Sequence, residues 1–151
     1  MTSRFAMAIH VLGKLAFVQR ERQATLTSEE LANSVQAHPV VVRRLLGGLR
    51  RAGLVDTKRG VGGGISLARP PERITLRDVY EAVEQDEEII ARNPHGPSLS
   101  CDIAPLITEY LDEVFGVAEQ ALKDSLVGVT IADLERELRA RLKGCAKRTA
   151  S

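Results

Sequence analysis

The chain has 151 residues and a formal net charge of +1, which is enough length for one core or for one small domain with an arm. No apolar run approaches the roughly 18 residues that a membrane span requires. Arg4, His10 and Lys14 interrupt the apolar residues of the N-terminus, so we expect no secretory signal, no membrane association and a cytoplasmic location. The two cysteines are too few and too far apart for a disulfide framework or a zinc site.

The small net charge conceals a strong asymmetry. Residues 1–69 hold 11 Lys and Arg against 4 Asp and Glu, a balance of +7, whereas residues 70–151 hold 10 against 16, a balance of −6. A basic half is the electrostatic footprint of a surface that binds a polyanion. The absence of Trp and the scarcity of other aromatic residues argue against single-strand binding by base stacking. We therefore expect nucleic acid to contact the N-terminal half and not the acidic half.

Residues 27–69 have the pattern of a helix-turn-helix followed by a hairpin, after a first helix expected at 3–17. Thr27 can cap a helix, and Glu30, three residues on, can complete a capping box. A short turn leads to Pro39, which suits the first turn of a second helix because its missing N–H would have no partner there. The pattern predicts two consecutive short helices.

The second helix of this pair carries two kinds of side chain. Its apolar stripe has the i, i+3, i+4, i+7 spacing of a buried helix face and consists of Val42, Leu45, Leu46 and Leu49. Its other faces carry four arginines, Arg43, Arg44, Arg50 and Arg51. Gly53 is placed to end the helix in the left-handed conformation that glycine adopts at low cost. Such a helix can pack on a core and present cations to DNA.

Two extended segments, 54–57 and 64–68, flank a basic and glycine-rich stretch that contains Lys58, Arg59 and Gly62. Glycine lets the backbone approach a phosphate closely, and Lys or Arg can reach the DNA backbone or a minor groove. A hairpin with a flexible, cationic tip is typical of a winged helix-turn-helix domain. We therefore predict a mainly α protein with a small β-hairpin wing.

The acidic half is expected to be helical. Thr75 can cap a short helix that ends near Glu84, and a loop at 85–100 precedes a long helix that continues to about Leu126. One side of the long helix has the spacing of a coiled-coil seam, formed by Ile107, Tyr110, Val114, Val117 and Ala121. A single small domain cannot cover so wide an apolar arc on a helix roughly 30 Å long. We therefore predict a homodimer joined through this helix.

The predicted organisation has four parts. Residues 1–84 form the winged helix-turn-helix DNA-binding domain, 85–100 a loop, 101–142 the dimerisation helices and 143–151 a basic tail. Within the third part Gly128 is expected to end the long helix, and Thr130 with Asp133 to begin a last helix.

Four stretches carry a resemblance to a known family: FAMA at 5–8, LRRAGLV at 49–55, RGVGGG at 59–64 with LAR at 67–69, and ITLRDVYEAVE at 74–84. On these the sequence resembles the Rrf-two family of bacterial winged-helix transcriptional regulators, to which IscR and NsrR belong. The resemblance implies a homodimer that binds a palindromic operator, usually as a repressor. Carried over by position, the recognition helix would present His38, Val40, Val41, Arg43 and Arg44 to base edges, and Arg59 would enter a minor groove.

One departure from the family concerns its iron–sulfur cluster. Cluster-binding members have three cysteines in the loop before the long helix, whereas residues 85–104 hold only Cys101. The acidic ligand that the first helix supplies to one type of cluster is also missing, because no Asp or Glu precedes Glu21. We therefore expect no cluster of the family type, no other cofactor and no metal site.

Several DNA-binding candidates keep a second interpretation. The predicted set is Ser28, His38, Val40, Val41, Arg43, Arg44, Arg50, Arg51, Lys58, Arg59 and Gly62. Arg on a recognition helix pairs best with guanine O6 and N7, but Arg50 and Arg51 could instead complement the helix dipole. Val40 and Val41 are either partly buried or in contact with thymine methyl groups. The glycines at 47 and 48 each destabilise a helix by about 1 kcal/mol relative to alanine. Close approach of another helix or of DNA would justify this cost, and simple sequence drift would also explain it.

Cys101 is the candidate for a redox sensor, because a helix N-terminus favours its thiolate. Asp102 beside it acts in the opposite direction, and an inert reduced thiol is the alternative. Cys145 could pair with Cys101 or with its counterpart in a dimer. His10 and His38 have no metal-ligand spacing to other ligands, so we expect core packing for the first and DNA contact for the second.

These features favour a homodimeric, sequence-specific transcriptional regulator, a repressor in the first instance, that responds to a thiol or ligand signal. The alternative is a winged-helix module whose basic face docks an acidic protein. An enzyme is not expected, because the chain has no nucleophile–base pair, metal set or phosphate loop, and its glycine run at 62–64 lacks the strand–loop–helix context of a nucleotide site.

Overall fold

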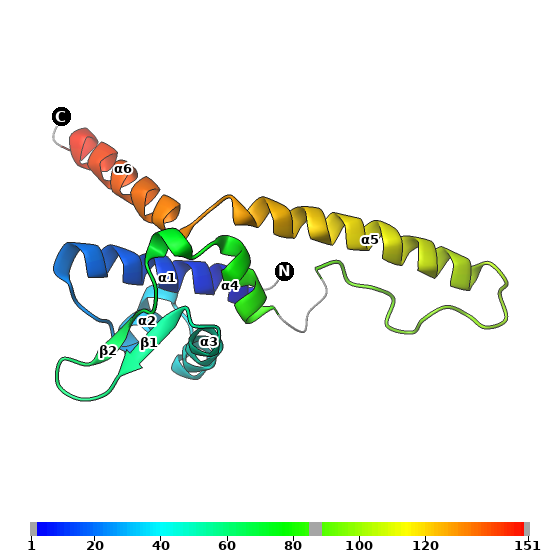
Figure 1. Cartoon of the computed structure of the whole chain (residues 1–151), viewed down its shortest axis with the longest axis horizontal. Helices are drawn as coiled ribbons and strands as arrows, with labels where there is room; N and C mark the ends of the chain where they lie inside the picture. The colour runs from blue at the N-terminus through cyan, green and yellow to red at the C-terminus, as the bar shows by residue number, and fades with distance from the viewer. Residues whose placement is uncertain (1–2, 85–88, 150–151) are drawn as a thin grey trace.

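The computed structural model describes residues 3–84 and 89–149, with side chains for 4–84 and 89–145. The elements are α1 (Ser3–Arg22), α2 (Ser28–Val35), α3 (Pro39–Arg51), β1 (Val55–Lys58), β2 (Gly64–Leu67), the 3-10 helix η1 (Pro71–Arg73), α4 (Leu76–Val83), α5 (Ala104–Val127) and α6 (Ile131–Thr149). In Figure 1, α1 to α4 and the β1–β2 hairpin form a body from which α5 and α6 project in different directions. The predicted mainly α fold with a β-hairpin wing is confirmed. In the described ranges no helix is both long and apolar enough to cross a bilayer.

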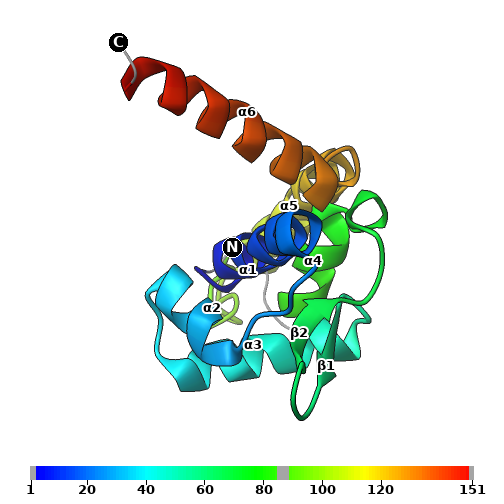
Figure 2. The ribbon, with the colours of Figure 1, turned by 90° about the vertical axis from the view of Figure 1, so that its left-hand side faces the viewer.

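α1 runs through the centre of the body, between α2 and α3 on one side and α6 on the other (Figure 2). Its buried apolar residues are Phe5, Ala8, Val11, Leu12, Leu15 and Ala16. The helix continues past its predicted end near Phe17 to Arg22. Gln, Arg and Glu are good helix formers, and a tertiary contact holds the added turn, because Arg20 pairs with Glu135 of α6 at 3.2 Å. The polar composition of this segment therefore marks a helix surface and not the predicted loop.

The predicted helix-turn-helix is present as α2 and α3. The capping box forms, with the Thr27 amide donating to the Glu30 carboxylate at 2.8 Å. Gln36 makes the turn in the left-handed conformation, with φ of 51°. α3 then begins at Pro39, and Gly53, with φ of 70°, follows its end. The residues that α3 buries are the predicted stripe, Val42, Leu45, Leu46 and Leu49.

The wing is a two-stranded antiparallel hairpin in which Val55 is opposite Leu67. β1 is shifted by one residue toward the C-terminus relative to the predicted 54–57, and β2 ends one residue before the predicted 64–68. Leu26 adds a bridge to the edge of β2, because its amide donates to the Ile65 carbonyl at 3.1 Å. At the tip, a Cβ atom on Gly63 would lie 2.2 Å from the Lys58 carbonyl oxygen, so the turn requires glycine there.

α4 and α6 both begin at the predicted threonine caps. The Thr75 amide donates to Asp78 at 2.8 Å, and the Thr130 amide donates to Asp133 at 2.8 Å. α6 does not end near residue 142 but continues to Thr149, so the predicted basic tail is helical as far as that residue. Lys and Arg have high helix propensity, which a prediction based on charge alone overlooks.

α6 packs across α1 at its N-terminal end. A Cβ atom on Gly13 would lie 2.7 Å from the Leu134 side chain, so the two helices cross closely at this glycine. Beyond the crossing, Glu135 is only 2% exposed and pairs with Arg20 and Arg139. The start of α6 is therefore fixed to the body, although the sequence pattern grouped it with α5.

α5 projects from the body and buries none of its residues (Figure 1). Its C-terminal end is joined to α4, where Arg77 pairs with Asp124 at 3.4 Å. Residues 89–103 lead outward beside α5 to its N-terminal end and contain no helix or strand. Arg92 holds this segment, because its guanidinium donates to Asp112 at 2.8 Å and to Glu119 at 3.2 Å. The predicted loop is thus confirmed for 89–100, while its residues 85–88 lie outside the described part of the chain.

Candidate nucleic-acid interface

The exposed side of α3 lies opposite its buried stripe. Val40 is 51% exposed and Val41 is 42% exposed, so both valines lie at the surface and neither belongs to the core. The four arginines of the helix, Arg43, Arg44, Arg50 and Arg51, are also exposed. His38 precedes the helix and caps it, because its ring Nδ1 accepts the Val40 amide at 3.2 Å. The free side of α3 is therefore apolar in its first turn and cationic beyond it.

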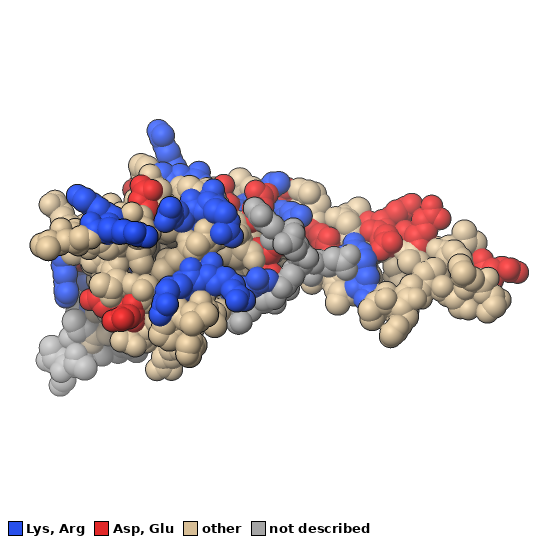
Figure 3. Space-filling model, turned by 90° about the horizontal axis from the view of Figure 1, so that it is seen from below, with Lys and Arg blue, Asp and Glu red and all other residues tan. Residues whose placement is uncertain are grey.

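The structure brings four predicted DNA-binding residues together around one hollow of about 450 Å³ between α3, the start of α2 and the wing. These residues are Ser28, Arg43, Arg50 and Lys58. The hollow is also lined by Thr27, Thr57 and four glycine or apolar residues of the wing. Figure 3 shows this side of the molecule, with Lys and Arg gathered over the body and Asp and Glu prominent along α5. The charge asymmetry of the sequence is thus an asymmetry between two parts of the structure.

Arg44 and Arg51 belong to a different hollow, of about 280 Å³, on the other flank of α3. Val41 lines it as well, together with Arg4 and the end of α4. Arg4, which lies 40 residues before Arg44 in the chain, was not among the predicted residues. Its only signal was its membership of the basic half, since tertiary packing alone places the start of α1 beside α3. The predicted arginines therefore form two groups and not one.

The two glycines inside α3 are not required by packing within this chain. A Cβ atom on Gly47 would lie 3.6 Å from the Arg51 guanidinium, and one on Gly48 would lie 3.4 Å from the Ala82 carbonyl oxygen. Both are ordinary van der Waals distances. Close approach of another helix of the chain therefore does not explain the pair.

The wing presents its predicted residues at the surface. Lys58, Arg59 and Gly62 are exposed, and Gly62 has a φ of 73°, which glycine adopts without strain. The Thr25 hydroxyl donates to the Gly63 carbonyl at 2.8 Å and ties the tip to the segment before α2. The wing and α2 are therefore held in a fixed relation.

One carboxylate lies at the edge of this interface. Hydrogen bonds from the Thr27 amide and hydroxyl lower the pKa of Glu30 below its usual value, so this group is charged at neutral pH. It is engaged in the α2 cap and contributes negative charge there. A phosphate beside Ser28 would therefore depend on Arg43 and Lys58 for its countercharge.

The predicted dimerisation residues are exposed in this chain. Ile107, Tyr110, Val114 and Val117 are 52%, 66%, 43% and 73% exposed, and Ala121 is exposed as well. Monomeric proteins rarely leave contiguous apolar surface of this kind uncovered. The arrangement is suited to contact with another apolar helix.

Cys101 does not lie in the first turn of α5, contrary to the expectation. The helix begins at Ala104, and the Cys101 carbonyl accepts the amide of that residue at 3.3 Å, so the thiol belongs to the preceding turn. Cys101 and Cys145 are both exposed free cysteines. His10 is exposed too, and its ring shares a hydrogen bond of 2.9 Å with the Ser34 hydroxyl, so the expected core packing of this histidine was wrong.

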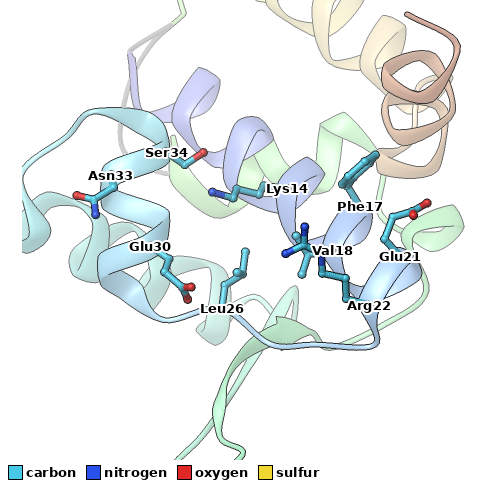
Figure 4. Close-up of a pocket in the computed structure, with 9 residues that line it drawn as sticks. All are labelled: Lys14, Phe17, Val18, Glu21, Arg22, Leu26, Glu30, Asn33 and Ser34. Atoms are coloured by element: carbon cyan, nitrogen blue, oxygen red, sulfur yellow. The ribbon is translucent and has the colours of Figure 1, made fainter. Parts of the chain in front are cut away.

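A hollow of about 600 Å³ lies between α1 and α2. Figure 4 shows Phe17, Val18 and Leu26 around it, together with the cations Lys14 and Arg22 and the carboxylates Glu21 and Glu30. Because charges of both signs surround it, this hollow is not matched to one class of ligand as clearly as the α3–wing surface is matched to a polyanion. The candidate functional site is therefore the surface of α3 and the wing.

A capped helix-turn-helix, a hairpin wing and a cationic face on the second helix define a winged helix-turn-helix protein. The profile of the Rrf2 family, described as an iron-dependent transcriptional regulator, matches residues 1–137. The chain belongs to the Rrf2 family.

Relatives and solved structures agree with this assignment. YwnA of Bacillus subtilis, a provisionally assigned HTH-type transcriptional regulator, is 33% identical over 91% of this chain and 98% of its own. The HTH-type transcriptional regulator IscR of Cereibacter sphaeroides is 38% identical over 54% of this chain and 52% of its own. The solved structure of T. potens IscR has a TM-score of 0.65 at 20% identity, covering 91% of this chain and 87% of that one, which shows the common fold.

The residues of this chain do not fit an iron–sulfur cluster of the family type. The chain has two cysteines, and the loop before α5 holds only Cys101. In the described residues, moreover, no group of three His, Cys, Asp or Glu side chains lies together in a way that could hold a metal ion. We therefore derive no role for a cluster in the function of this protein.

Proposed function

We propose that this protein is a homodimeric, sequence-specific DNA-binding transcriptional regulator that represses from a palindromic operator. The observation that carries the proposal is the convergence of Ser28, Arg43, Arg50 and Lys58 around the hollow between α3 and the wing. These residues come from three elements, and the three charged ones are all cations. The membership of the Rrf2 family and the names of its relatives support the same function.

The proposal gives each part of the interface a role. α3 enters the major groove, where His38, Val40, Val41, Arg43 and Arg44 meet base edges. Arg50, Arg51, Ser28 and Lys58 contact phosphates, and Arg59 enters the neighbouring minor groove while Gly62 lets the wing backbone approach. Phosphate contacts position the protein, and the contacts of α3 supply the sequence preference.

The dimer is proposed to form through α5. Its exposed seam of Ile107, Tyr110, Val114, Val117 and Ala121 would be buried against the same helix of a second copy. A two-fold dimer presents two copies of α3 to one duplex, with half-sites about one helical turn, roughly 34–36 Å, apart or a multiple of it. In this proposal residues 1–84 are the DNA-binding unit. Of the dimerisation unit expected at 101–142, α5 supplies the interface, because the start of α6 packs on α1.

The test is an electrophoretic mobility-shift titration with genomic fragments, including the promoter of the gene itself, at several salt concentrations. If each protomer neutralises about four phosphates, the slope of log K against log salt is expected near −7. Fragments that bind no better than random DNA would exclude a sequence-specific regulator. Absence of any salt-sensitive duplex binding, with an acidic protein retained in pull-down, would favour the alternative of a protein-interaction module.

The wing is tested by Arg59→Ala. The substitution is expected to weaken binding, most strongly at operators with narrow A·T-rich minor grooves, which attract an inserted arginine. Arg141→Ala is the matched control, because Arg141 is an exposed arginine on α6 that pairs with Glu137. Equal affinity of Arg59→Ala and the native protein would remove the wing from the interface.

A thiol-responsive form of the proposal places the sensor at Cys101, the exposed cysteine before α5. Mild peroxide is then expected to weaken operator binding by the native protein and not by Cys101→Ser. Equal sensitivity of the two proteins would exclude this thiol and leave a small-molecule signal as the form of regulation to examine.

A further inference from the structure

The first turn of α3 has a chemical character that differs from the rest of the interface. Val40 and Val41 are 51% and 42% exposed, whereas the outward positions that follow are occupied by arginine or glycine. Contact of exposed valine side chains with water is unfavourable, and arginines that would be drawn to a duplex follow the two valines in the next turn of α3. Val41 lines the same hollow as Arg4, Arg44 and Arg51.

His38 fixes the conformation of this turn and adds a polar group to it. Its ring Nδ1 accepts the Val40 amide at 3.2 Å, so the neutral ring carries its proton on Nε2, where it is a hydrogen-bond donor. In the described part of the chain no hydrogen bond is recorded for Nε2. The turn therefore combines one donor with two apolar side chains.

Only one base presents a complementary pattern in the major groove. Thymine shows an acceptor, O4, beside an apolar group, its 5-methyl. Guanine shows two acceptors and no methyl group, cytosine shows a donor, and adenine pairs a donor with an acceptor. We propose, resting on the proposed DNA-binding function, that the first turn of α3 reads thymine, with Val40 and Val41 against its methyl group and His38 as donor to O4.

The next turn of α3 carries an arginine that would contact a different base. Arg44 lies four residues after Val40 on the same outward ridge of the helix, a rise of about 6 Å. Consecutive base pairs are about 3.4 Å apart, so an arginine at that position reaches about two base steps further. Because arginine pairs best with guanine, each half-site is expected to hold a guanine within about two steps of the thymine.

The test begins with selection of bound duplexes from a random pool by the full chain. In the selected operator each thymine is then replaced, one at a time, by deoxyuridine, which lacks only the 5-methyl group. Loss of one buried methyl contact is expected to weaken binding by about fourfold at one or two positions of each half-site. The double variant Val40→Ala/Val41→Ala is expected to bind the thymine and deoxyuridine duplexes alike.

Two controls separate this reading from a general loss of affinity. Val129→Ala removes a valine that is 41% exposed in the α5–α6 connection, and it should keep the native sensitivity to deoxyuridine. Arg59→Ala should bind more weakly overall and keep that sensitivity as well. Circular dichroism of the valine variants confirms that the helix content is native.

The outcomes distinguish this proposal from the proposed function. If the pool yields no enriched sequence, sequence-specific binding itself fails. If a sequence is enriched but native binding ignores every deoxyuridine, or the double variant keeps the native sensitivity, the reading of thymine by α3 is overturned while the regulator stands.

Discussion

The winged-helix body and α5, which projects from it as an arm, differ in how their helices are stabilised. In the body each of the helices α1 to α4 buries apolar residues, and threonine capping boxes start α2 and α4. α5 is the longest helix, yet it buries no residue and has no side-chain cap at its N-terminus. Most helix stability in proteins comes from packing of an apolar face. The body therefore contains the contacts that hold it, whereas the described residues leave the apolar seam of α5 exposed.

Charge follows the same division. The basic face lies on the body and acidic residues predominate along α5 (Figure 3). Like charges repel, so an acidic helix would not be drawn to a DNA backbone, whereas the apolar seam of the arm is exposed. In the proposed function, DNA recognition is assigned to the body and dimer assembly to the α5 arm.

The strongest way to break this comparison is Val114→Glu. A charge in the centre of the proposed seam would have to be buried without a partner, so the dimer should dissociate while the body stays folded. Loss of the second binding unit is expected to weaken operator binding by about 10²–10⁴-fold. Analytical ultracentrifugation and mobility-shift titration measure the two effects. Glu113→Gln, which changes the charge of the neighbouring exposed position of α5 outside the seam, should leave both unchanged; a dimeric Val114→Glu protein would contradict the assignment of the interface.

A substitution in the buried core tests the other half of the comparison, the stability of the body. Leu49 is fully buried in α3, and Leu49→Ala should lower the free energy of unfolding by about 2–5 kcal/mol through lost burial and a cavity. Leu99, in the segment before α5, is 97% exposed, so Leu99→Ala should leave stability within about 0.5 kcal/mol. Urea denaturation followed by circular dichroism gives both values. Equal effects would mean that the segment before α5 is packed in solution.

The division between the two regions also explains what could be predicted. The caps, the buried stripe of α3 and the wing follow from local patterns, because turn chemistry and side-chain periodicity act within a few residues. The helical ends beyond Phe17 and Leu142 were missed because tertiary contacts and high helix propensity stabilise polar turns there. The separation of Arg43 from Arg44 into two hollows, and the arrival of Arg4 beside α3, depend on packing between distant segments that no local pattern encodes.

Arg92 offers a smaller test, because it holds the segment before α5 against the arm. It donates to Asp112 and Glu119, and its guanidinium lies 5.8 Å from the centre of the Phe115 ring. Arg92→Ala should cost on the order of 1 kcal/mol, since partly exposed ion pairs and cation–π contacts are each weak. The sensitive measurement is proteolysis of residues 89–100, which should become faster. Arg136→Ala removes an exposed arginine from α6 and should not change the cleavage rate; equal rates in all three proteins would show that Arg92 does not hold this segment.

The smallest expected effect is the pH dependence of the contact between α5 and the segment that precedes it. Glu119 accepts the Ile90 amide at 3.1 Å, and this hydrogen bond, with the help of Arg92, lowers the pKa of Glu119 below its ordinary value of 4.5. Because the folded pKa is lower than the unfolded one, the contact is fully stabilising above the unfolded value and is lost as the pH falls through the folded value. The Ile90 amide resonance should therefore titrate with a midpoint below 4.5. Glu119→Gln should abolish that titration, and a midpoint at or above the ordinary value would show that the segment does not rest on α5 in solution.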